Sequence, residues 1–309
     1  MQKYRTAAIH YDNGSTVSVA RIEGSPAYQD FMRRDAALPP TARPLCDYIP
    51  PTLGTLLGIC TCPVGEDTAS VEAVMRELRA SVASSMGTNF CHANLVLWSR
   101  DHATDYQKQV IQQALTNIGL IQPTDGVLDG GSGAVHTNGV GSAYERTLLR
   151  ILVLAVDYSR YGLGAQLFWQ DADGVVEWVR GDHRLGAGPE EAAELLRAIA
   201  APPFGDDPTY VGWSDPTPTE ISKLVLYGDA ILDYNDVFQA ALGDVLGPRL
   251  VEDALAVDPV FAGTTWGARY AYERVNNWAF NRDPAFGCCW WSKWHNCWEY
   301  RPVVNGCLL

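Results

Sequence analysis

The stretch that decides the fold is ILVLAVDYSRYG, residues 151–162, in which six apolar residues lead directly into an aspartate and a short turn. An uninterrupted apolar run of this length predicts a strand buried on both faces, because half-exposed strands alternate apolar and polar residues. Residues 165–169, AQLFW, read as the returning strand. The stretch therefore predicts a hairpin whose buried strand ends at Asp157.

A hairpin of the same design is expected near the start of the chain. Residues 6–10, TAAIH, form a short apolar run, residues 12–16, DNGST, supply turn chemistry, and residues 17–22 resume with strand-like alternation. Both segments read as a strand, an aspartate at the tip, a turn and a second strand. The repetition predicts two duplicated lobes that face one cleft.

The rest of the chain predicts a mixed α/β order. Apolar residues three and four apart predict helices that begin at Asp67 or Thr68, cover residues 110–118, run from Pro189 to Ala200, run from Asn235 to Leu246 and cover residues 267–275. Short strands are expected at residues 94–98 and 224–227, a turn at 181–186 and a surface loop at 201–218. The glycine-rich residues 125–141 read as either a loop or a closely packed helix.

Composition limits the classes of function. The 309 residues carry a net charge of −13 and are 47% hydrophobic, which is enough for sizeable cores and disfavours binding to a phosphate backbone. No window approaches the length of a membrane span, and the first residues lack the apolar run of a signal peptide. We therefore expect no nucleic-acid partner, no membrane association and a cytoplasmic location; the oligomeric state stays open.

The eight cysteines lack the spacing of a zinc ribbon and the density of a disulfide scaffold, so most of them are expected to be reduced and packed. The tail is the exception to weigh, because Cys288, Cys289, His295 and Cys297 lie close together and offer metal-ligand chemistry. Adjacent cysteines chelate one tetrahedral ion awkwardly, and four tryptophans share the segment. Aromatic packing of the tail is the favoured interpretation, and no metal is expected.

Several of these turns together resemble the actin and seventy-kilodalton heat-shock chaperone superfamily, most closely its short fungal members, over residues 5–275. Residues 12–18 resemble the first phosphate hairpin, Asp157 at the end of its apolar strand resembles the start of the second, and residues 181–188, GDHRLGAG, resemble the stretch that follows. Residues 227–230 lie where the adenosine-contacting glycine turn would fall, and residues 258–268 resemble the start of the final connecting helix.

The resemblance implies a two-lobed actin-like ATPase fold, of the duplicated ribonuclease H-like type. Residues 1–145 would form the N-terminal lobe, residues 146–280 the C-terminal lobe and residues 281–309 a Trp- and Cys-rich tail. Only about forty residues separate Gly188 from Gly228, so the subdomain that clamps adenine in the chaperones would be missing.

The chain departs from the family at several nucleotide contacts. Ser159, Arg160 and Tyr161 replace the glycines of the second phosphate hairpin, and Asp229 stands in the adenosine turn. The catalytic lysine has no counterpart, and Asp129 is the best match to the glutamate of the connecting helix. The first hairpin keeps the amides, hydroxyls and carboxylate that a metal-bound phosphate needs.

These losses favour a scaffold that no longer works as an ATPase and uses its cleft on a small molecule without a cofactor, as an isomerase or cyclase of specialised metabolism. The expected catalytic residues are Asp12, Asp157 and His183; each aspartate also reads as a simple turn-former, and the histidine as a solvated loop residue. The expected cleft residues are Gly14, Ser15, Thr16, Tyr158, Ser159, Arg160, Tyr161, Asp182, Gly186, Tyr227, Gly228, Asp229 and Trp266. Two alternatives stay open, a Mg-ATP-binding chaperone-like module and a non-catalytic interaction protein.

Overall fold

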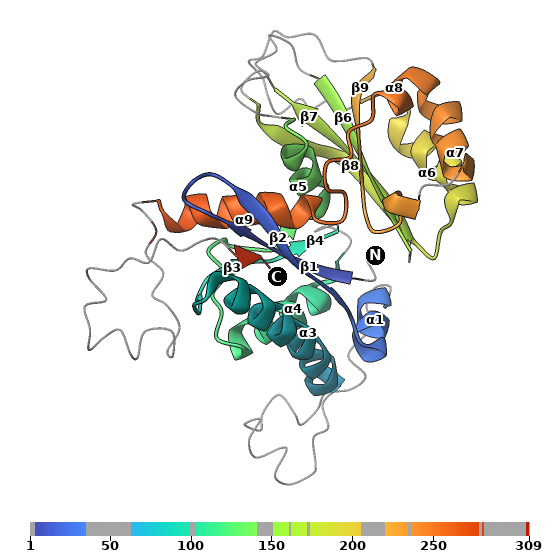
Figure 1. Ribbon diagram of the computed structural model, residues 1–309. Helices are drawn as coiled ribbons and strands as arrows, with labels where there is room; N and C mark the ends of the chain where they lie inside the picture. Colours follow the sequence, from blue (N-terminus) through green and yellow to red (C-terminus); the bar gives the residue numbers. More distant parts are fainter. Residues whose placement is uncertain are drawn as a thin grey trace, which may run out of the picture.

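The computed structural model describes residues 4–34, 63–98, 103–140, 151–160, 162–171, 174–204, 220–233, 236–277, 280 and 307–308. These residues form a mixed α/β structure with two four-stranded sheets, and helices α5 and α9 lie between the sheets (Figure 1). Among the described helices, none combines the length and apolar character needed to cross a membrane.

One four-stranded sheet has the strand order β8-β7-β6-β9. We call it the second sheet, because most of its strands come later in the chain. Its members are β6 (Ile151–Ser159), β7 (Gly162–Gln170), β8 (Val176–Leu185) and β9 (Ile221–Tyr227). Strand β6 is antiparallel to β7 and parallel to β9, so it lies in the middle of the sheet. Residues 152–156 of β6 are fully buried, which confirms that the strand is covered on both faces.

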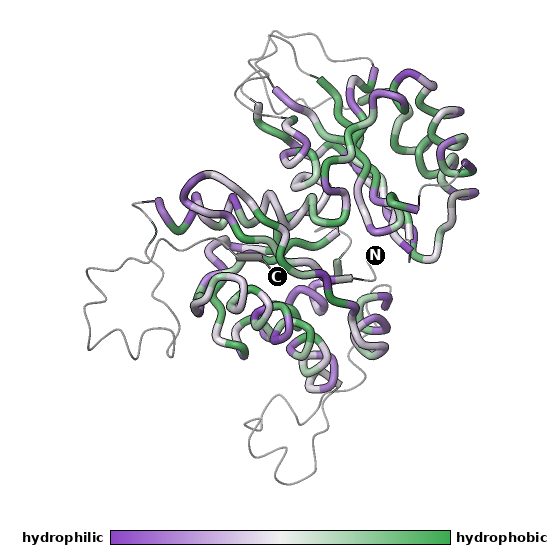
Figure 2. The backbone as a smooth tube through the Cα atoms, in the orientation of Figure 1, coloured by the Kyte–Doolittle hydropathy of each residue, from purple (hydrophilic) through white to green (hydrophobic). Residues whose placement is uncertain are grey.

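Each face of the second sheet has its own helices. Helix α6 (Pro189–Ala200) and helix α7 (Asp236–Leu246) pack on the face that carries Leu152, Leu154 and Val156, with the short η2 (Ile231–Asp233) and α8 (Pro248–Glu252) beside them. Helix α5 (Gly130–Thr137) covers the opposite face. Figure 2 shows hydrophobic colouring along the strands between these helices.

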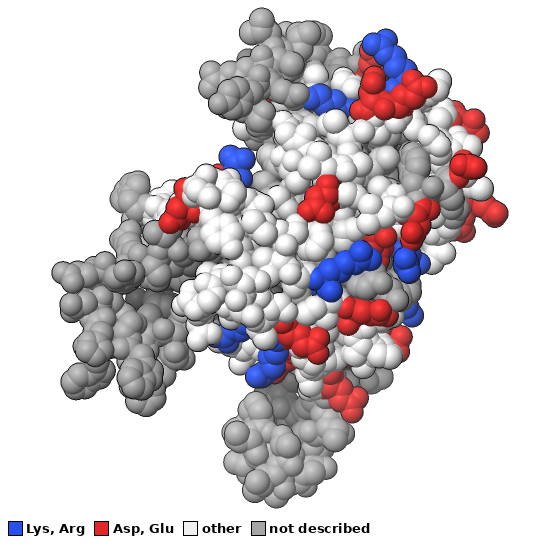
Figure 3. All heavy atoms as spheres, viewed as in Figure 1, with Lys and Arg blue, Asp and Glu red and all other residues white. Residues whose placement is uncertain are grey.

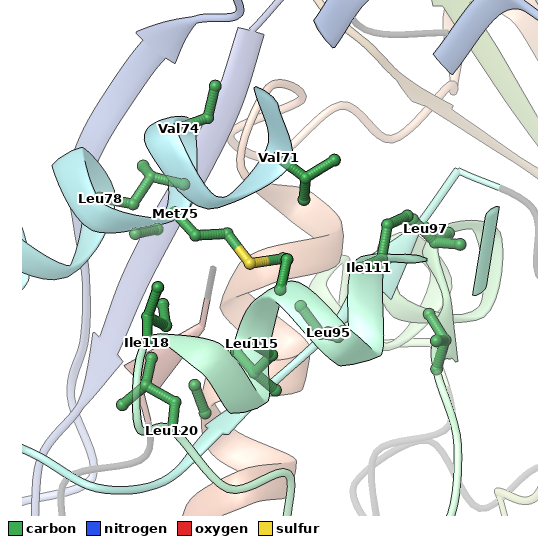
Figure 4. Close-up of a cluster of buried hydrophobic side chains, with 14 of the residues drawn as sticks. Val71, Val74, Met75, Leu78, Leu95, Leu97, Ile111, Leu115, Ile118 and Leu120 are labelled. Carbon is green, nitrogen blue, oxygen red and sulfur yellow. The ribbon is translucent and has the colours of Figure 1, made fainter. Parts of the chain in front are cut away.

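The first sheet has the order β2-β1-β10-β3. It contains β1 (Tyr4–His10), β2 (Thr16–Glu23), β3 (Ala93–Asn94) and β10 (Cys307–Leu308), while β4 (Val96–Leu97) continues β3 and pairs in parallel with β5 (Leu128–Asp129). Helices α1 (Pro26–Arg33), α3 (Pro63–Met86) and α4 (Asp105–Asn117) supply the core on one face, where side chains of α3 meet those of α4 and the strands (Figure 4). Thr104 begins α4 with a capping box to Gln107.

Each of the two helices between the sheets packs on the sheet that it does not follow in the chain. Helix α5 follows β5 of the first sheet region but packs on β6 and β9, whereas α9 (Ala262–Val275) follows the second sheet but packs on β1, β2 and β3. The helices meet at small residues, since a methyl group at Gly133 would lie 3.0 Å from the Cα of Gly263. Glycine at this crossing therefore permits close approach of the two backbones.

Three element boundaries differ from the sequence expectation. Residues 181–185 are part of β8 and not a turn, because they pair in register with residues 162–166 of β7. Helix α3 begins already at Pro63, and Asp67, expected as a cap, instead binds Arg34 at 2.8 Å. Helix α9 begins at Ala262, earlier than residue 267. For residues 125–141, the helix alternative is confirmed over α5.

Cys91 is disulfide-bonded. That most of the eight cysteines are reduced stays a prediction. The tail cluster of Cys288, Cys289, His295 and Cys297 lies outside the described residues. In the part of the chain that is described, no group of three or more His, Cys, Asp or Glu side chains is arranged to hold a metal ion.

Candidate active site at the junction of the two sheets

Asp157 lies at the carboxyl end of β6, at the edge of the second sheet that faces the first. Its strand partners are Gly164 in β7 and Tyr227 in β9. The side chain is only 1% exposed, and its Oδ1 accepts a hydrogen bond from the hydroxyl of Ser159. Its Oδ2 has no hydrogen-bond partner among the described residues. A buried carboxyl oxygen in this state lacks compensation for the loss of water.

Burial has a direct electrostatic consequence for this carboxyl. It raises the pKa of Asp157 from 3.8 to about 6, and the neighbouring carboxylates of Asp229 and Asp129 add to the rise. The cause is the cost of placing a negative charge away from water and next to other negative charges. Near neutral pH Asp157 can therefore both bind and release a proton, which a general acid or base requires.

His183 belongs to the same row of the sheet as Asp157. Gly164 pairs with Asp157 on one side and with His183 on the other, so all three residues face the same way. A methyl group at Gly164 would lie 2.8 Å from Cδ2 of His183 and 3.6 Å from Cβ of Asp157. The missing side chain at Gly164 thus lets the imidazole lie across the strand beside the aspartate. Two of the three predicted catalytic residues, Asp157 and His183, are thus brought together.

Trp98 covers this row from the first sheet. Its ring centroid lies 5.8 Å from that of His183, at an angle of 49°. The hydroxyl of Tyr227 donates a 3.4 Å hydrogen bond to the carbonyl oxygen of Trp98, and burial raises the pKa of this tyrosine well above its usual value. The indole Nε1 of Trp98 is buried without a partner in the described structure. The indole N–H of Trp98 and Oδ2 of Asp157 therefore both lack hydrogen-bond partners among the described residues at this junction.

A second polar pair, Asp129 of β5 and Gln166 of β7, lies at the start of helix α5. Asp129 caps the helix by accepting from the backbone N–H of Ser132 at 2.9 Å, and Gln166 donates from Nε2 to the same carboxylate at 3.1 Å. Oε1 of Gln166 has no partner among described residues. Sequence reasoning missed Gln166 and Trp98 as site residues. The available signal was a glutamine inside the apolar stretch 165–169, and a tryptophan at the end of a buried strand.

A small cavity of about 40 Å3 lies beside Tyr227 and Trp98. This volume has room for about three water molecules. Its wall is shared by both sheets and helices α5 and α9, with Arg5, Thr6, Val96, Leu97, Trp98, Gly130, Tyr227, Val260, Gly263 and Thr264 as lining residues.

The turn after β9 contains Gly228 and Asp229, and both residues have structural roles. Gly228 has a φ of +112°, and any side chain there would collide with Oδ1 of Asp157 and the carbonyl oxygen of Tyr158. Asp229 is 1% exposed and accepts from the backbone N–H of Arg160 at 3.0 Å. The carboxylate therefore fixes the tip of the β6–β7 hairpin to the β9 turn.

The first hairpin does not reach this junction. Strand β1 starts at the junction, where Arg5 and Thr6 line the cavity, and runs away from it, so the tip at residues 12–15 lies at the far end of the sheet (Figure 1). Asp12 contacts Tyr272 near the end of α9. The tip is closed on itself, because Gly14 N–H donates to Tyr11 O and Ser15 N–H donates to Oδ1 of Asn13. Thr16 donates or accepts with His10 at 2.7 Å.

The other expected cleft residues take different places. Tyr158 stacks on Phe238 at 4.2 Å, on the opposite face of the second sheet from Asp157, and Trp266 stacks on His136 at 5.2 Å. Arg160 reaches outward to Asp233 at 2.9 Å. Asp182 accepts a hydrogen bond from the N–H of His183, and Gly186 follows β8 with a φ of +74°. Tyr161 lies outside the described residues.

The surface adds no sign of a nucleic-acid interface on the face drawn in Figure 3, where basic and acidic side chains of the described residues are interspersed. In comparisons with known proteins, no family model matches the chain and no curated sequence matches it. The geometry of the junction is therefore the basis for a proposed function.

Proposed function

We propose that the chain is a degenerate two-lobed actin-like scaffold that does not hydrolyse ATP and uses the junction between its sheets for acid–base chemistry on a small molecule. The observation that carries the proposal is Asp157, a buried carboxyl group with an unpartnered oxygen and a pKa of about 6, next to the imidazole of His183. A buried carboxyl group with a raised pKa and an imidazole, side by side under an aromatic cover, suit a cofactor-free isomerase or cyclase.

The architecture supports the scaffold part of this proposal. Each sheet begins with antiparallel strands, continues through a helix to a further strand, and sends its last helix across to the other sheet. This order is what a duplicated ribonuclease H-like unit predicts, with one lobe around each sheet. The chain between β8 and β9 contains α6 and too few residues for an adenine-clamping subdomain.

Mg-ATP is the alternative ligand, and the residues present do not fit it. Triphosphate cradles need several free backbone N–H groups that converge on one space. Here the N–H of Arg160 binds Asp229, the N–H of Gly228 donates to Pro259 O at 2.9 Å, and the first hairpin tip lies at the far end of its sheet. The carboxylates of Asp129 and Asp229 would also repel phosphate oxygens.

In the proposed reaction, Asp157 in its ionised form takes a proton from a carbon or oxygen of the substrate, and His183 in its protonated form gives one to a second position. The net result is an isomerisation in which the substrate keeps all its atoms. The cavity of about 40 Å3 is too small for an organic substrate, so we propose that the sheets separate at the α5–α9 crossing to admit it.

The proposal is tested by incubating the protein in heavy water with a panel of small ketones and enones and measuring deuterium incorporation by mass spectrometry. We expect at least one member to be labelled by the wild-type chain, and Asp157→Asn and His183→Gln to reduce the rate by ~100-fold or more, in the range of lost general acid–base catalysis. Asp12→Asn is the matched control and should keep the wild-type rate, because its carboxylate lies at the other hairpin.

Two results would contradict the proposal. Labelling of no member of the panel would remove the acid–base function. A rise in melting temperature at millimolar Mg-ATP that Asp157→Asn abolishes would restore the nucleotide-binding alternative, because a ligand that binds only the folded state stabilises it.

A further inference from the structure

The cavity of about 40 Å3 is bordered by two hydrogen-bond donors that have no partner among the described residues. They are the indole Nε1 of Trp98 and Nη2 of Arg5, and both residues belong to the cavity wall. Trp98 is only 8% exposed. Buried N–H groups in folded proteins almost always have an acceptor, and neither an indole N–H nor a guanidinium can itself accept a hydrogen bond. The two donors therefore require an acceptor, and the cavity is the space that both residues border.

The hydroxyl groups of the cavity wall already have partners. Tyr227 donates to a main-chain carbonyl oxygen at 3.4 Å, and Thr264 donates to Phe261 O at 2.9 Å. Because the proton of Thr264 is used there, the hydroxyl of Thr6 donates to Thr264, 3.3 Å away. None of the described residues that line the cavity is an aspartate or a glutamate. The wall thus offers two unused donors and one positive charge, that of Arg5.

The guanidinium of Arg5 is held in place and stays charged. It lies 4.8 Å from the ring centroid of Tyr28, a residue of α1 that is 4% exposed, and its strand partner in the first sheet is Ile22. Burial lowers the pKa of Arg5 to about 10, so the group remains positive near neutral pH. The carboxylate of Asp229 acts on it through space and accepts a hydrogen bond from the N–H of Arg160. The donor at Nη2 is therefore preorganised for a ligand.

The size and the charge of the cavity select a class of ligand. The cavity has room for about three water molecules, and a carboxylate group fills a similar space with one carbon and two oxygens. Each oxygen can accept from one of the two unused donors, and a hydrogen bond between a guanidinium and a carboxylate is among the strong ones. A single negative charge is balanced by Arg5, whereas a triphosphate brings several charges next to Asp129 and Asp229. A carboxylate fits the cavity where a triphosphate does not.

We propose that the cavity is a binding pocket for the carboxylate group of a small organic acid, held by Arg5 and Trp98. The pocket borders the acid–base pair, because Tyr227 in its wall pairs with Asp157 in the second sheet. The ring of Trp98 also lies 5.8 Å from that of His183. The identification of this acid as the substrate rests on the proposed function. With its carboxylate in the pocket, the acid presents its carbon chain to Asp157 and His183 once the sheets separate, and the expected substrates are keto acids and unsaturated acids.

Formate tests the pocket without any substrate, because it is a carboxylate that carries only hydrogen. Sodium formate is titrated into the full chain at constant ionic strength, and binding is measured by isothermal titration calorimetry. We expect a dissociation constant of about 1 mM, near the limit for so small a ligand. Arg5→Met and Trp98→Phe should each weaken binding by ~10-fold, the effect of losing one hydrogen bond to a charged group. Arg76→Met removes an exposed arginine of α3 and is the matched control, which should bind as wild type.

The two variants make the test independent of any single substitution. Circular dichroism first checks that each variant is folded, and Trp98→Phe keeps an aromatic ring while it removes the N–H, so it carries the test if Arg5→Met does not fold. Absence of saturable formate binding to the wild-type chain would overturn the proposal. Binding of the same strength in the wild type and in the folded variants would overturn it as well, because formate would then lie elsewhere.

A second experiment separates failure of the pocket from failure of the proposed function. In the heavy-water assay the wild-type chain should label keto acids at least ~10-fold faster than their methyl esters, which keep the ketone and lose the charge, and Arg5→Met should remove this preference. Formate binding that depends on Arg5 and Trp98, with no compound labelled, would support the pocket and contradict the acid–base function. Equal labelling of acids and esters would overturn the assignment of the carboxylate to the substrate.

Discussion

The two hairpins that look alike in the sequence differ in what surrounds them. Each has a strand, an aspartate and a glycine-containing segment, yet Asp12 contacts Tyr272 at the outer end of α9, whereas Asp157 is buried between the two sheets. Gly14 has open space around its Cα, while Gly228 beside the second hairpin is enclosed by Asp157 and Tyr158. The difference teaches that turn chemistry specifies a hairpin, and that the direction of the strand specifies what its tip can reach.

Strand direction follows from the partners of each strand. Strand β6 runs toward the junction because it is parallel to β9, whose turn holds Gly228 and Asp229. Strand β1 runs away from the junction because it is antiparallel to β10, and β10 is parallel to β3. The first hairpin therefore corresponds in position to β7 and β8, not to β6 and β7. An aspartate at its tip therefore lies away from Asp157 and His183.

The largest expected effect is on the free energy of unfolding, when a glycine at each hairpin is replaced by alanine. Gly228→Ala should lower the free energy of unfolding by about 3 kcal/mol or more, because it combines a positive φ with a collision against Asp157 and Tyr158. Gly14→Ala is the matched control: its φ is +82° but no atom lies within 4 Å, so only the backbone strain of about 1–2 kcal/mol applies. Urea unfolding of both variants measures the gap, and equal losses would contradict the difference in enclosure.

The two aspartates should differ in their pH dependence. The folded pKa of Asp157 is about 6 against 3.8 for the free side chain, so the folded state binds the proton more tightly than the unfolded state. Stability from this group is complete below pH 4 and is lost as the pH rises through 6, by up to about 3 kcal/mol. Asp157→Asn removes the ionisation, and we expect it to match wild type at pH 4 and to be more stable at pH 8.

Denaturant unfolding at several pH values checks this expectation, with Asp12→Asn as the control at the other hairpin. The control should change stability by less than about 0.5 kcal/mol at every pH, because its carboxyl is exposed. A destabilised Asp157→Asn variant at pH 8 would mean that the ionised carboxylate has stabilising partners and is not a strained acid or base.

Local patterns were sufficient to predict much of the second sheet and little of its site. The apolar run at residues 151–156 predicted a central strand, and the buried β6 confirms it, because an unbroken apolar run has no other stable environment in a soluble core. Asp157 and His183 were both expected as site residues. Their proximity follows from the register of β6, β7 and β8, which depends on pairing across the sheet and is not encoded in a local pattern.

The wrong predictions also arise from pairing between strands, which a local pattern does not encode. Residues 181–186 carry glycine and aspartate and predicted a turn, but pairing with β7 holds residues 181–185 in a strand, where Gly181 makes room for Gln166. Gln166 and Trp98 were not predicted as site residues, because each lies in a strand whose apolar pattern is already accounted for by packing in the core. Contacts between segments distant in the sequence, as between Trp98 and His183, override what each segment suggests alone.

The smallest expected effect concerns the contact that holds the first hairpin to the segment before α9. Ser18 donates a 2.7 Å hydrogen bond to Oδ2 of Asp258, and Asp258 has a positive φ of 41°. Ser18→Ala should cost about 0.5–1.5 kcal/mol, the range of an ordinary hydrogen bond, because both groups are exposed, and it should leave the deuterium-exchange activity unchanged. Asp258→Asn keeps an acceptor and tolerates this backbone conformation, so it should cost less than Ser18→Ala. If either variant changed the pH dependence of Asp157→Asn, the two hairpins would be coupled energetically, and their separation by strand direction would not hold.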